Sequence, residues 1–337
     1  MAQPLPSAAL LADLYKVRPA IYWVDFLASA GTGWAAFAIG ALSPWGSFSG
    51  LVAIIIAVFA LNRAVAFTHE ISHHRRGLTG FEAAWNAVVG FPLLLPTFIY
   101  GQVHLDHHRT AMYGTNADPS YLPFARSSWT VTAYLLHTLI APAFLALRFM
   151  LLAPIGFVSG RVEIWLIERA SAIAFNPAYR RKATPGLVRL ARRDSALLLA
   201  MWAVLIAFGL VAIDTGVLIR AATLWYVVMV AIGFLEAIRT LTEHAYESPG
   251  VPIDKPAQIA DSNDIPGRFW TELWAPLGLH YHATHHAFPG VPYYALPRAY
   301  RRLLASTPGH GRMTRPGLLW ALRRLYGKDN RGDDAPR

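Results

Sequence analysis

Nine of the 13 histidines in this chain fall into three short clusters. The clusters read His69-Glu-Ile-Ser-His73-His74, His104-Leu-Asp-His107-His108 and His282-Ala-Thr-His285-His286. A neutral imidazole is a good ligand for first-row transition metals. Because one zinc ion takes about four ligands, nine histidines are too many for a single metal ion and suit two. The clusters therefore predict a two-metal site.

The spacing within the clusters favours helices. Residues i, i+3 and i+4 share one face of a helix, so each H-x-x-H-H cluster is expected to aim three imidazoles at one point. In the first cluster His69 and His73 share a face, whereas His74 points about 100° away. We expect all nine histidines to be metal ligands. Of the four others, we expect His137, His280 and His310 to lie apart from the site.

The composition indicates a membrane protein. The chain is 55% hydrophobic and only 15% charged, with a mean hydropathy of +0.35, which is too apolar for an ordinary soluble domain of 337 residues. It contains no cysteine, which excludes disulfides and thiolate metal sites. We find no cleaved signal peptide and no lipidation motif. One domain over residues 1–337 is expected, with a frayed tail at 327–337.

Four stretches are long enough to cross a bilayer as helices, at about residues 20–42, 49–67, 195–213 and 217–238. The connections between the first two and between the last two are very short, so the spans form two hairpins. Lys and Arg concentrate on the side of the hairpins opposite to these connections, and the positive-inside rule then places both termini in the cytoplasm. The net charge of +10 is explained by basic loops that face anionic lipid, so no nucleic acid partner is implied.

Two further apolar stretches, Phe81–Tyr100 and Tyr134–Val158, contain prolines, and the second also contains Arg148. Prolines break regular helix and a charge inside the bilayer is costly. A crossing at Phe81–Tyr100 would also separate the first two clusters across the membrane. We therefore expect both stretches to be interfacial or re-entrant helices on the cytoplasmic face. The predicted fold is an all-α integral membrane protein with four spans and a cytoplasmic, histidine-rich cap.

His244 follows the last predicted span and is expected to emerge on the same side as the three clusters. It is therefore a candidate tenth ligand. Beside it stands Glu243, and the clusters themselves contain Glu70 and Asp106. These three carboxylates are expected to orient the metal-binding imidazoles rather than to bind metal.

The clusters, their order and the paired spans resemble those of the membrane fatty acid desaturase family, over about residues 20–304. Gly114-Thr-Asn-Ala-Asp118-Pro after the second cluster and His286-Ala-Phe-Pro-Gly-Val-Pro after the third strengthen the resemblance. The family implies a non-haem di-iron centre that activates O2 and removes two hydrogens from an acyl chain of a membrane lipid. It also implies that the cluster histidines and His244 bind the two iron ions. Relatives often carry an asparagine where this chain has Thr240.

The resemblance also implies electrons from outside the chain. No cytochrome b5-like His-Pro-Gly-Gly motif is present, so a separate ferredoxin, rubredoxin or cytochrome is expected to deliver them. The expected location is a bacterial inner membrane, with the active site on the cytoplasmic side. The position of the double bond and the head group of the substrate cannot be derived from these residues.

Other functions share some of these residues. His69-Glu70-x-x-His73 matches the zinc metalloprotease motif, with Glu70 as general base, but leaves seven cluster histidines unexplained. A metal transporter would place its ligands near the middle of the bilayer. Within the superfamily, hydroxylases, carotenoid ketolases and alkane monooxygenases use the same metal chemistry. Desaturation is the primary prediction, and insertion of oxygen into a lipid, alkane or carotenoid is the alternative.

Overall fold

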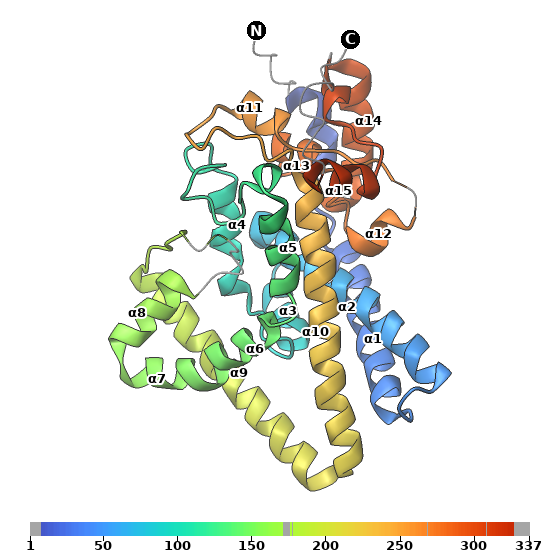
Figure 1. Ribbon diagram of the computed structural model, residues 1–337, viewed down its shortest axis with the longest axis vertical. Coiled ribbons are helices and arrows are strands. Elements are labelled where there is room, and N and C mark those ends of the chain that lie inside the picture. Colours follow the sequence, from blue (N-terminus) through green and yellow to red (C-terminus); the bar gives the residue numbers. More distant parts are fainter. Residues whose placement is uncertain (1–7, 171–175, 177, 268, 308, 327–337) are drawn as a thin grey trace.

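All regular elements in the part of the chain that the structure describes are helical, as expected. The computed structural model describes residues 8–170, 176, 178–267, 269–307 and 309–326, so the predicted frayed tail lies outside the described residues. Four long helices extend from a cap of shorter ones (Figure 1), and they are α1 (Pro19–Leu42), α2 (Phe48–His74), α9 (Pro185–Ala212) and α10 (Thr215–Glu243).

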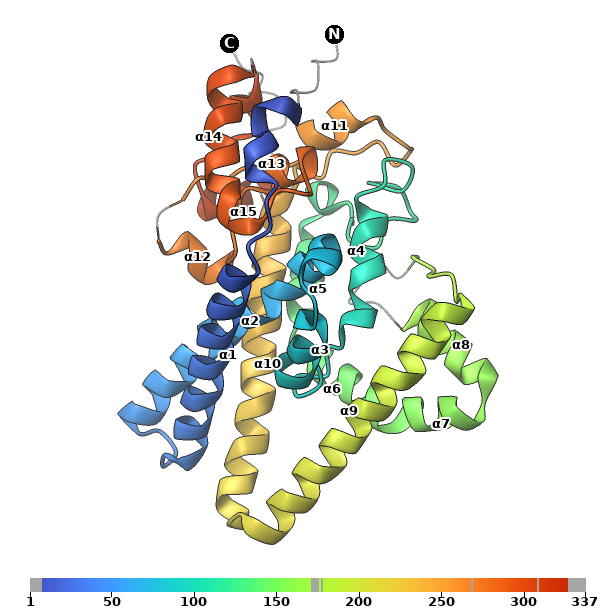
Figure 2. The same ribbon diagram turned by 180° about the vertical axis from the view of Figure 1, so that it is seen from behind.

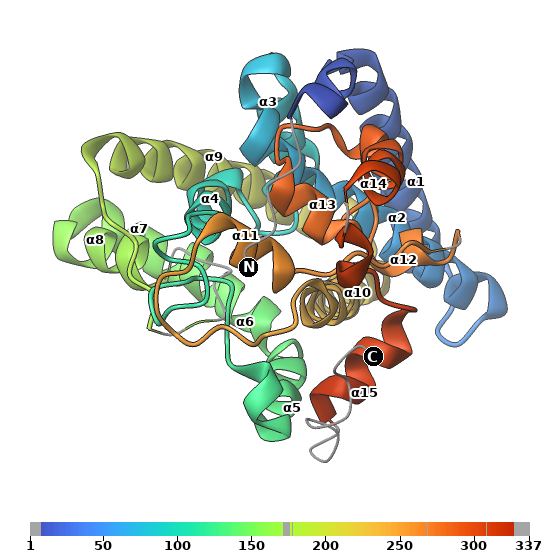
Figure 3. The same cartoon turned by 90° about the horizontal axis from the view of Figure 1, so that it is seen from above.

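The shorter helices form the cap and a lateral arm. Seen from above, the cap helices gather around the end of α10 (Figure 3). The cap contains α4 (Gly101–His107), α11 (Lys255–Ala260), α12 (Thr271–Trp274), α13 (His282–Ala287), α14 (Leu296–Ser306) and α15 (Leu318–Tyr326). Between α2 and α9 in the sequence come α3 (Phe81–Trp85), α5 (Ser128–His137), α6 (Ala141–Ala146), α7 (Ala153–Val158) and α8 (Gly160–Arg169). Helices α7 and α8 form the lateral arm at one side of the molecule (Figure 1).

Each predicted span falls within one of the four long helices. The helices are longer than the predicted spans at the cap end: α2 continues to His74, α9 already begins at Pro185, and α10 continues to Glu243. A helix can extend beyond its apolar region because each further residue adds one backbone hydrogen bond. These extensions matter because they carry the first histidine cluster and the residues beside His244 into the cap.

A fifth stretch, Ala141–Val158, is also long and apolar enough to cross a membrane, in addition to the four expected helices. It consists of α6, a π-helical segment over Leu147–Leu152, and α7. Pro142 stands in the first turn of α6, where its missing N–H costs no hydrogen bond, whereas Pro154 follows the π-helical segment inside the 18-residue stretch. Neither proline ends the helix, contrary to expectation. Figures 1 and 2 show α7 lying across the direction of α10.

The stretch Phe81–Tyr100 is not a continuous helix. It contains α3, a π-helical turn, irregular backbone and a short 3-10 turn, and Phe81 and Trp85 are fully buried. Irregular backbone in an apolar environment needs partners for its carbonyl groups. Three indoles of the long helices supply them: Trp34 donates to Val88 O (2.8 Å), Trp202 to Phe91 O (2.9 Å) and Trp225 to Pro92 O (2.9 Å). The tryptophans thus anchor the broken segment that leads into α4.

The hairpin of α1 and α2 depends on close packing. A Cβ atom at Gly33 would lie 2.7 Å from the side chain of Leu61, so only glycine allows the two helices to approach this closely. Helix α10 packs against both α1 and α2. As a result, the cap ends of α2 and α10 are held side by side beneath the third histidine cluster.

Candidate metal centre

Ten predicted ligands come from four helix ends that meet in the cap. His69, His73 and His74 lie in the last turns of α2, and the second cluster forms the end of α4. His244 is the residue that directly follows α10, and the third cluster forms α13. These segments are distant in the sequence, so the centre exists only when the two hairpins and the cap pack together.

One group contains five imidazoles whose ligand nitrogens all lie within 4.8 Å of one another. The shortest separations join His73 Nε2 to His104 Nε2 (2.9 Å), His108 Nε2 to His104 Nε2 (3.0 Å), and His69 Nε2 to His285 Nε2 (3.1 Å). His285 Nε2 also lies 3.2 Å from His108 Nε2. Three of the five side chains are buried and two are partly exposed.

A second group contains four imidazoles, all of them buried, with the same 4.8 Å limit between their ligand nitrogens. His244 Nε2 lies 3.1 Å from His107 Nε2 and 3.1 Å from His282 Nε2. His286 Nε2 lies 2.9 Å from His282 Nε2. His244, the candidate that stands outside the three clusters, is therefore surrounded by cluster histidines.

The structure corrects the expectation that each H-x-x-H-H cluster aims three imidazoles at one point. His104 and His108 belong to the group of five, whereas His107 belongs to the group of four. In the third cluster His282 and His286 belong to the group of four and His285 to the group of five. Neighbouring helix residues point about 100° apart, so the i and i+4 residues share a group and the i+3 residue faces the other.

The donor sets fit metal ions. Burial lowers the pKa of the imidazoles outside the spans, which favours the neutral form that binds metal; these are His104, His108, His244, His282, His285 and His286. A neutral imidazole carries a single N–H. Four nitrogens that converge on one point therefore cannot all find hydrogen-bond partners among themselves. One cation at the centre of each group satisfies all of the converging lone pairs, and imidazole donors suit first-row transition metals.

His74 is the one predicted ligand that the structure does not bring into either group. Its Nε2 atom is buried and lies 3.8 Å from Glu70 Oε2. This position follows from the helix geometry, because His74 points about 100° away from His73. The structure thus gathers nine of the ten predicted ligands into the two groups.

A buried carboxylate that had no predicted role holds His107. Both oxygens of Asp118 lie 2.9–3.0 Å from His107 Nδ1, and Asp118 is completely buried. The same carboxylate accepts hydrogen bonds from the backbone N–H groups of Gly114 and Ser120, both at 2.8 Å. A carboxylate on Nδ1 fixes the ring orientation and makes Nε2 a stronger donor to metal.

A second buried network holds His244. The hydroxyl of Tyr113 lies 2.8 Å from His244 Nδ1 and donates to Asp261 Oδ2 at 2.9 Å. Tyr121 donates to the same Asp261 oxygen at 2.6 Å. Desolvation raises the pKa of both tyrosines, with the negative charge of Asp261 as a further cause, so their hydroxyls stay protonated. None of these three residues stands in a histidine cluster, so spacing alone does not point to them.

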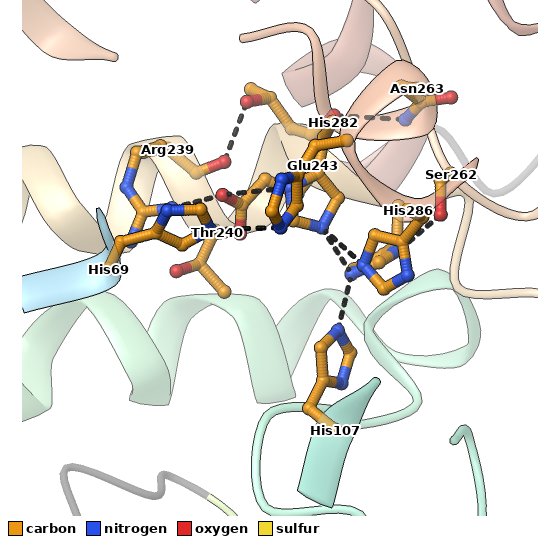
Figure 4. Close-up of polar contacts among 12 residues, drawn as sticks. His69, His107, Arg239, Thr240, Glu243, Ser262, Asn263, His282 and His286 are labelled. Carbon is orange, nitrogen blue, oxygen red and sulfur yellow. Dashed lines mark hydrogen bonds and ion pairs between the residues drawn. The ribbon is translucent and has the colours of Figure 1, made fainter. Parts of the chain in front are cut away.

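Two of the three predicted carboxylates lie against imidazoles. Glu70 Oε1 is 3.3 Å from His69 Nδ1, and Glu243 Oε1 is 3.4 Å from His282 Nδ1. Glu243 is also paired with Arg239 of α10. Figure 4 shows Thr240 and Glu243 between His69 and His282.

The carboxylate of Glu70 already makes three contacts. Its second oxygen accepts from the Tyr22 hydroxyl at 2.6 Å and from the Tyr293 backbone N–H at 3.2 Å. With its first oxygen beside His69, Glu70 is fully used in holding the site. This geometry argues against the metalloprotease alternative, in which Glu70 would have to activate water.

Asp106 lies elsewhere. Its oxygens accept hydrogen bonds from Gln102 (2.9 Å), Arg109 (3.2 Å) and the hydroxyl of Tyr179 (2.8 Å). It therefore ties α4 to the segment before α9 instead of orienting an imidazole. On the helix it is the neighbour of His107, and the 100° step turns it away from the metal groups.

The histidines that we expected to lie apart divide into two kinds. His137 is on α5 with its ring beside Phe144, and His280 pairs with Ile265 O and Glu272. Neither belongs to the group of five or the group of four imidazoles. His310 is different, because its Nε2 lies 3.3 Å from the hydroxyl of Thr284, inside the third cluster, and 3.2 Å from Asp264 Oδ2. The expectation for His310 was therefore too simple: it packs directly behind α13.

The comparisons with known proteins agree with the geometry. A family model described as fatty acid desaturase matches residues 43–317. The chain belongs to this family. It is also 34% identical over 328 residues to a ceramide hydroxylase of Caulobacter vibrioides (strain NA1000 / CB15N), which covers 95% of this chain and 92% of the relative.

Each group is expected to hold one metal ion. The variant His285→Ala removes a donor from the group of five, and His107→Ala removes one from the group of four. Either change should lower the metal content of the purified protein from two ions per chain towards one and abolish turnover. His137→Ala is the matched control and should keep both ions. Unchanged metal content in both variants, measured by elemental mass spectrometry, would contradict the assignment.

Asp118 is expected to strengthen metal binding through His107. The substitution Asp118→Asn keeps the shape of the side chain but removes the negative charge beside His107 Nδ1, and it should weaken binding of the ion in the group of four by about 10–100-fold. Asp106→Asn is the control, because Asp106 contacts no imidazole. A chelator titration measures both. Equal loss of affinity in the two variants would mean that Asp118 acts only through general stability.

Proposed function

We propose that this protein is an O2-dependent, two-iron enzyme that hydroxylates an alkyl chain of a membrane lipid of the ceramide class. The observation that carries the proposal is the pair of all-histidine groups at the end of membrane-length helices, in a chain so similar to a ceramide hydroxylase. Bound iron would supply the oxidising power to break an unactivated C–H bond, which side chains alone do not have.

The protein's own residues would bind the metal ions and keep bulk water away from the reacting alkyl chain. The nine grouped histidines bind the ions as neutral donors, while Asp118 and Glu70 fix ring orientations through Nδ1 and Glu243 places a carboxylate 3.4 Å from His282 Nδ1. The group of four is buried, which excludes bulk water from the reacting alkyl chain.

A surface cleft reaches His73 of the group of five imidazoles. It has a volume of ≈ 520 Å³ and is lined by Val17 and by Ser72–Gly77, which includes His73. It lies where α2 leaves the apolar region, so a lipid could keep its polar head in water while its chain approaches the metal. The exposed Arg75 and Arg76 at this cleft would face polar head groups.

Desaturation is the second candidate, favoured by the family match and by the sequence after the third cluster. Both reactions begin with removal of one hydrogen from the alkyl chain. They differ afterwards, since a second hydrogen loss gives an alkene and oxygen transfer gives an alcohol. The placement of the chain relative to the site decides between them.

Two electrons must come from another protein. The chain has no cysteine to hold an iron–sulfur cluster, so the donor would be a ferredoxin, rubredoxin or cytochrome. The cap carries many basic residues, among them Arg298, Arg301, Arg312 and Arg323, and such a surface favours an acidic partner.

The same proposal includes four membrane crossings with the site in the cytoplasm of a bacterium. The ends of α2 and α10 meet at the metal groups, and α9 and α10 form a hairpin. The chain between α2 and α9 therefore starts and ends on one side of the membrane. Ala141–Val158 alone cannot cross under this condition, which favours an interfacial or re-entrant position for it.

The reaction is tested with purified protein, an electron-donor system, a ceramide and 18O2. The expected main product is a ceramide whose alkyl chain carries an 18O hydroxyl group, and the variant His285→Ala should give none. A phospholipid with the same acyl chain is the substrate control. A product that has lost two hydrogens and contains no 18O would make the enzyme a desaturase and overturn the hydroxylase assignment.

The topology is tested with single cysteines, because the chain has none of its own. Trp45→Cys lies in the exposed connection between α1 and α2 and should react only from the periplasmic side. Arg312→Cys in the cap should react only from the cytoplasm. Gly46 is avoided, since its φ of 72° strains any other residue. Labelling of both positions from the same side would contradict four crossings.

A further inference from the structure

Arg148 is a buried cation that the metal centre does not use. It lies in the π-helical segment between α6 and α7 and is only 6% exposed. Its Nε donates to Ala170 O at 2.6 Å, and its guanidinium lies over the ring of Phe149 at 4.3 Å. Its Nη1 atom is buried and has no hydrogen-bond partner among the described residues.

None of the described contacts of Arg148 is with a carboxylate. Besides Ala170 O, its guanidinium faces the rings of Phe149 and, at 5.4 Å, Phe98. A buried charge without an opposite charge beside it is strongly unfavourable. Arg181, which is also positive and also buried, repels it. No acidic side chain among the described residues is paired with Arg148.

A small cavity opens beside the guanidinium. Its volume is ≈ 20 Å³, and a space of about 10–15 Å³ already holds one water molecule, so one oxygen atom of a ligand fits. Its lining includes Arg148, Gly156, Glu163, Leu166, Arg192 and Ser195. Glu163 is the one acidic residue among the lining residues, and both of its oxygens already accept from Arg192, at 2.9 and 2.7 Å.

The surface around the cavity is apolar. Large hydrophobic side chains of α6 to α8 are between 42% and 89% exposed, namely Phe144, Leu147, Leu151, Ile155, Val158, Ile164 and Trp165. Figure 3 shows α7 and α8 projecting to one side of the molecule, away from the cap. In a protein that spans a membrane, this arm is surrounded by lipid.

We infer that the arm formed by α6, α7 and α8 binds an anionic membrane phospholipid, with a phosphate oxygen in the cavity and paired to the guanidinium of Arg148. The acyl chains lie along the exposed apolar side chains. A soluble anion would gain nothing from that apolar surface. Basic pockets between membrane helices on the cytoplasmic side are suited to anionic head groups. The site is separate from the metal groups and independent of the proposed reaction.

The test uses the full-length protein in nanodiscs of phosphatidylcholine into which phosphatidylglycerol is titrated. Native mass spectrometry counts the retained lipids, and thermal unfolding reports the stabilisation. The wild type should retain phosphatidylglycerol in preference to phosphatidylcholine. Arg148→Gln should weaken this binding at least about tenfold, or 1.4 kcal/mol. Arg148→Lys keeps the charge and should retain most of it.

Arg161→Gln is the matched control, because Arg161 is an exposed arginine on the same arm, and its lipid binding should not change. If Arg148→Gln does not fold, the wild type still decides the question through its lipid preference. Equal retention of the two lipids would overturn the inference. Equal stabilisation by inorganic phosphate in lipid-free detergent would overturn it too, by indicating a site for a soluble anion.

Discussion

Neighbouring residues of an α-helix point about 100° apart, and this step determines how the candidate metal centre is built. It divides each H-x-x-H-H cluster, so that His107 faces one group and His108 the other. Helices α4 and α13 each contribute to both groups and thereby hold the two sites at one relative position. The remaining donors arrive from the ends of α2 and α10. The long hairpins, the cap and the loops between them are arranged so that these four helix ends meet.

Bringing nine imidazoles together requires that they stay neutral and keep their orientation. Burial favours the neutral form, and acceptors on Nδ1 set the direction of Nε2. Asp118 does this for His107, and the pair of Tyr113 and Asp261 does it for His244. Behind α13, the contact of His310 with Thr284 and Asp264 supports the third cluster. The centre therefore depends on polar residues that bind no metal themselves.

Much of this arrangement was predictable from the sequence because it follows from local patterns. Long apolar runs predict long helices, and grouped histidines predict a metal site. The division of each cluster between two groups was not predicted. The i, i+3, i+4 rule assigns the i+3 and i+4 residues to the same helix face, although their side chains point about 100° apart. Asp106 was predicted to orient an imidazole because it stands inside a cluster. The carboxylate that contacts His107 Nδ1 is instead that of Asp118, in a loop 11 residues further along the chain. Contacts such as these depend on how distant segments pack, which spacing does not encode. Pro142 and Pro154 were misleading for a related reason, because Pro142 stands in the first turn of a helix and a π-helical segment directly precedes α7 with Pro154.

The central claim is that nine histidines form two neighbouring metal sites of different composition, one with five nitrogen donors and one with four. Mössbauer spectroscopy of the protein loaded with 57Fe tests it most directly, because each iron environment gives its own signal. The account predicts two signals of equal area, and it predicts that His107→Ala alters mainly one of them and His285→Ala mainly the other. A single iron environment, or one iron per chain in protein that is fully active, would contradict it.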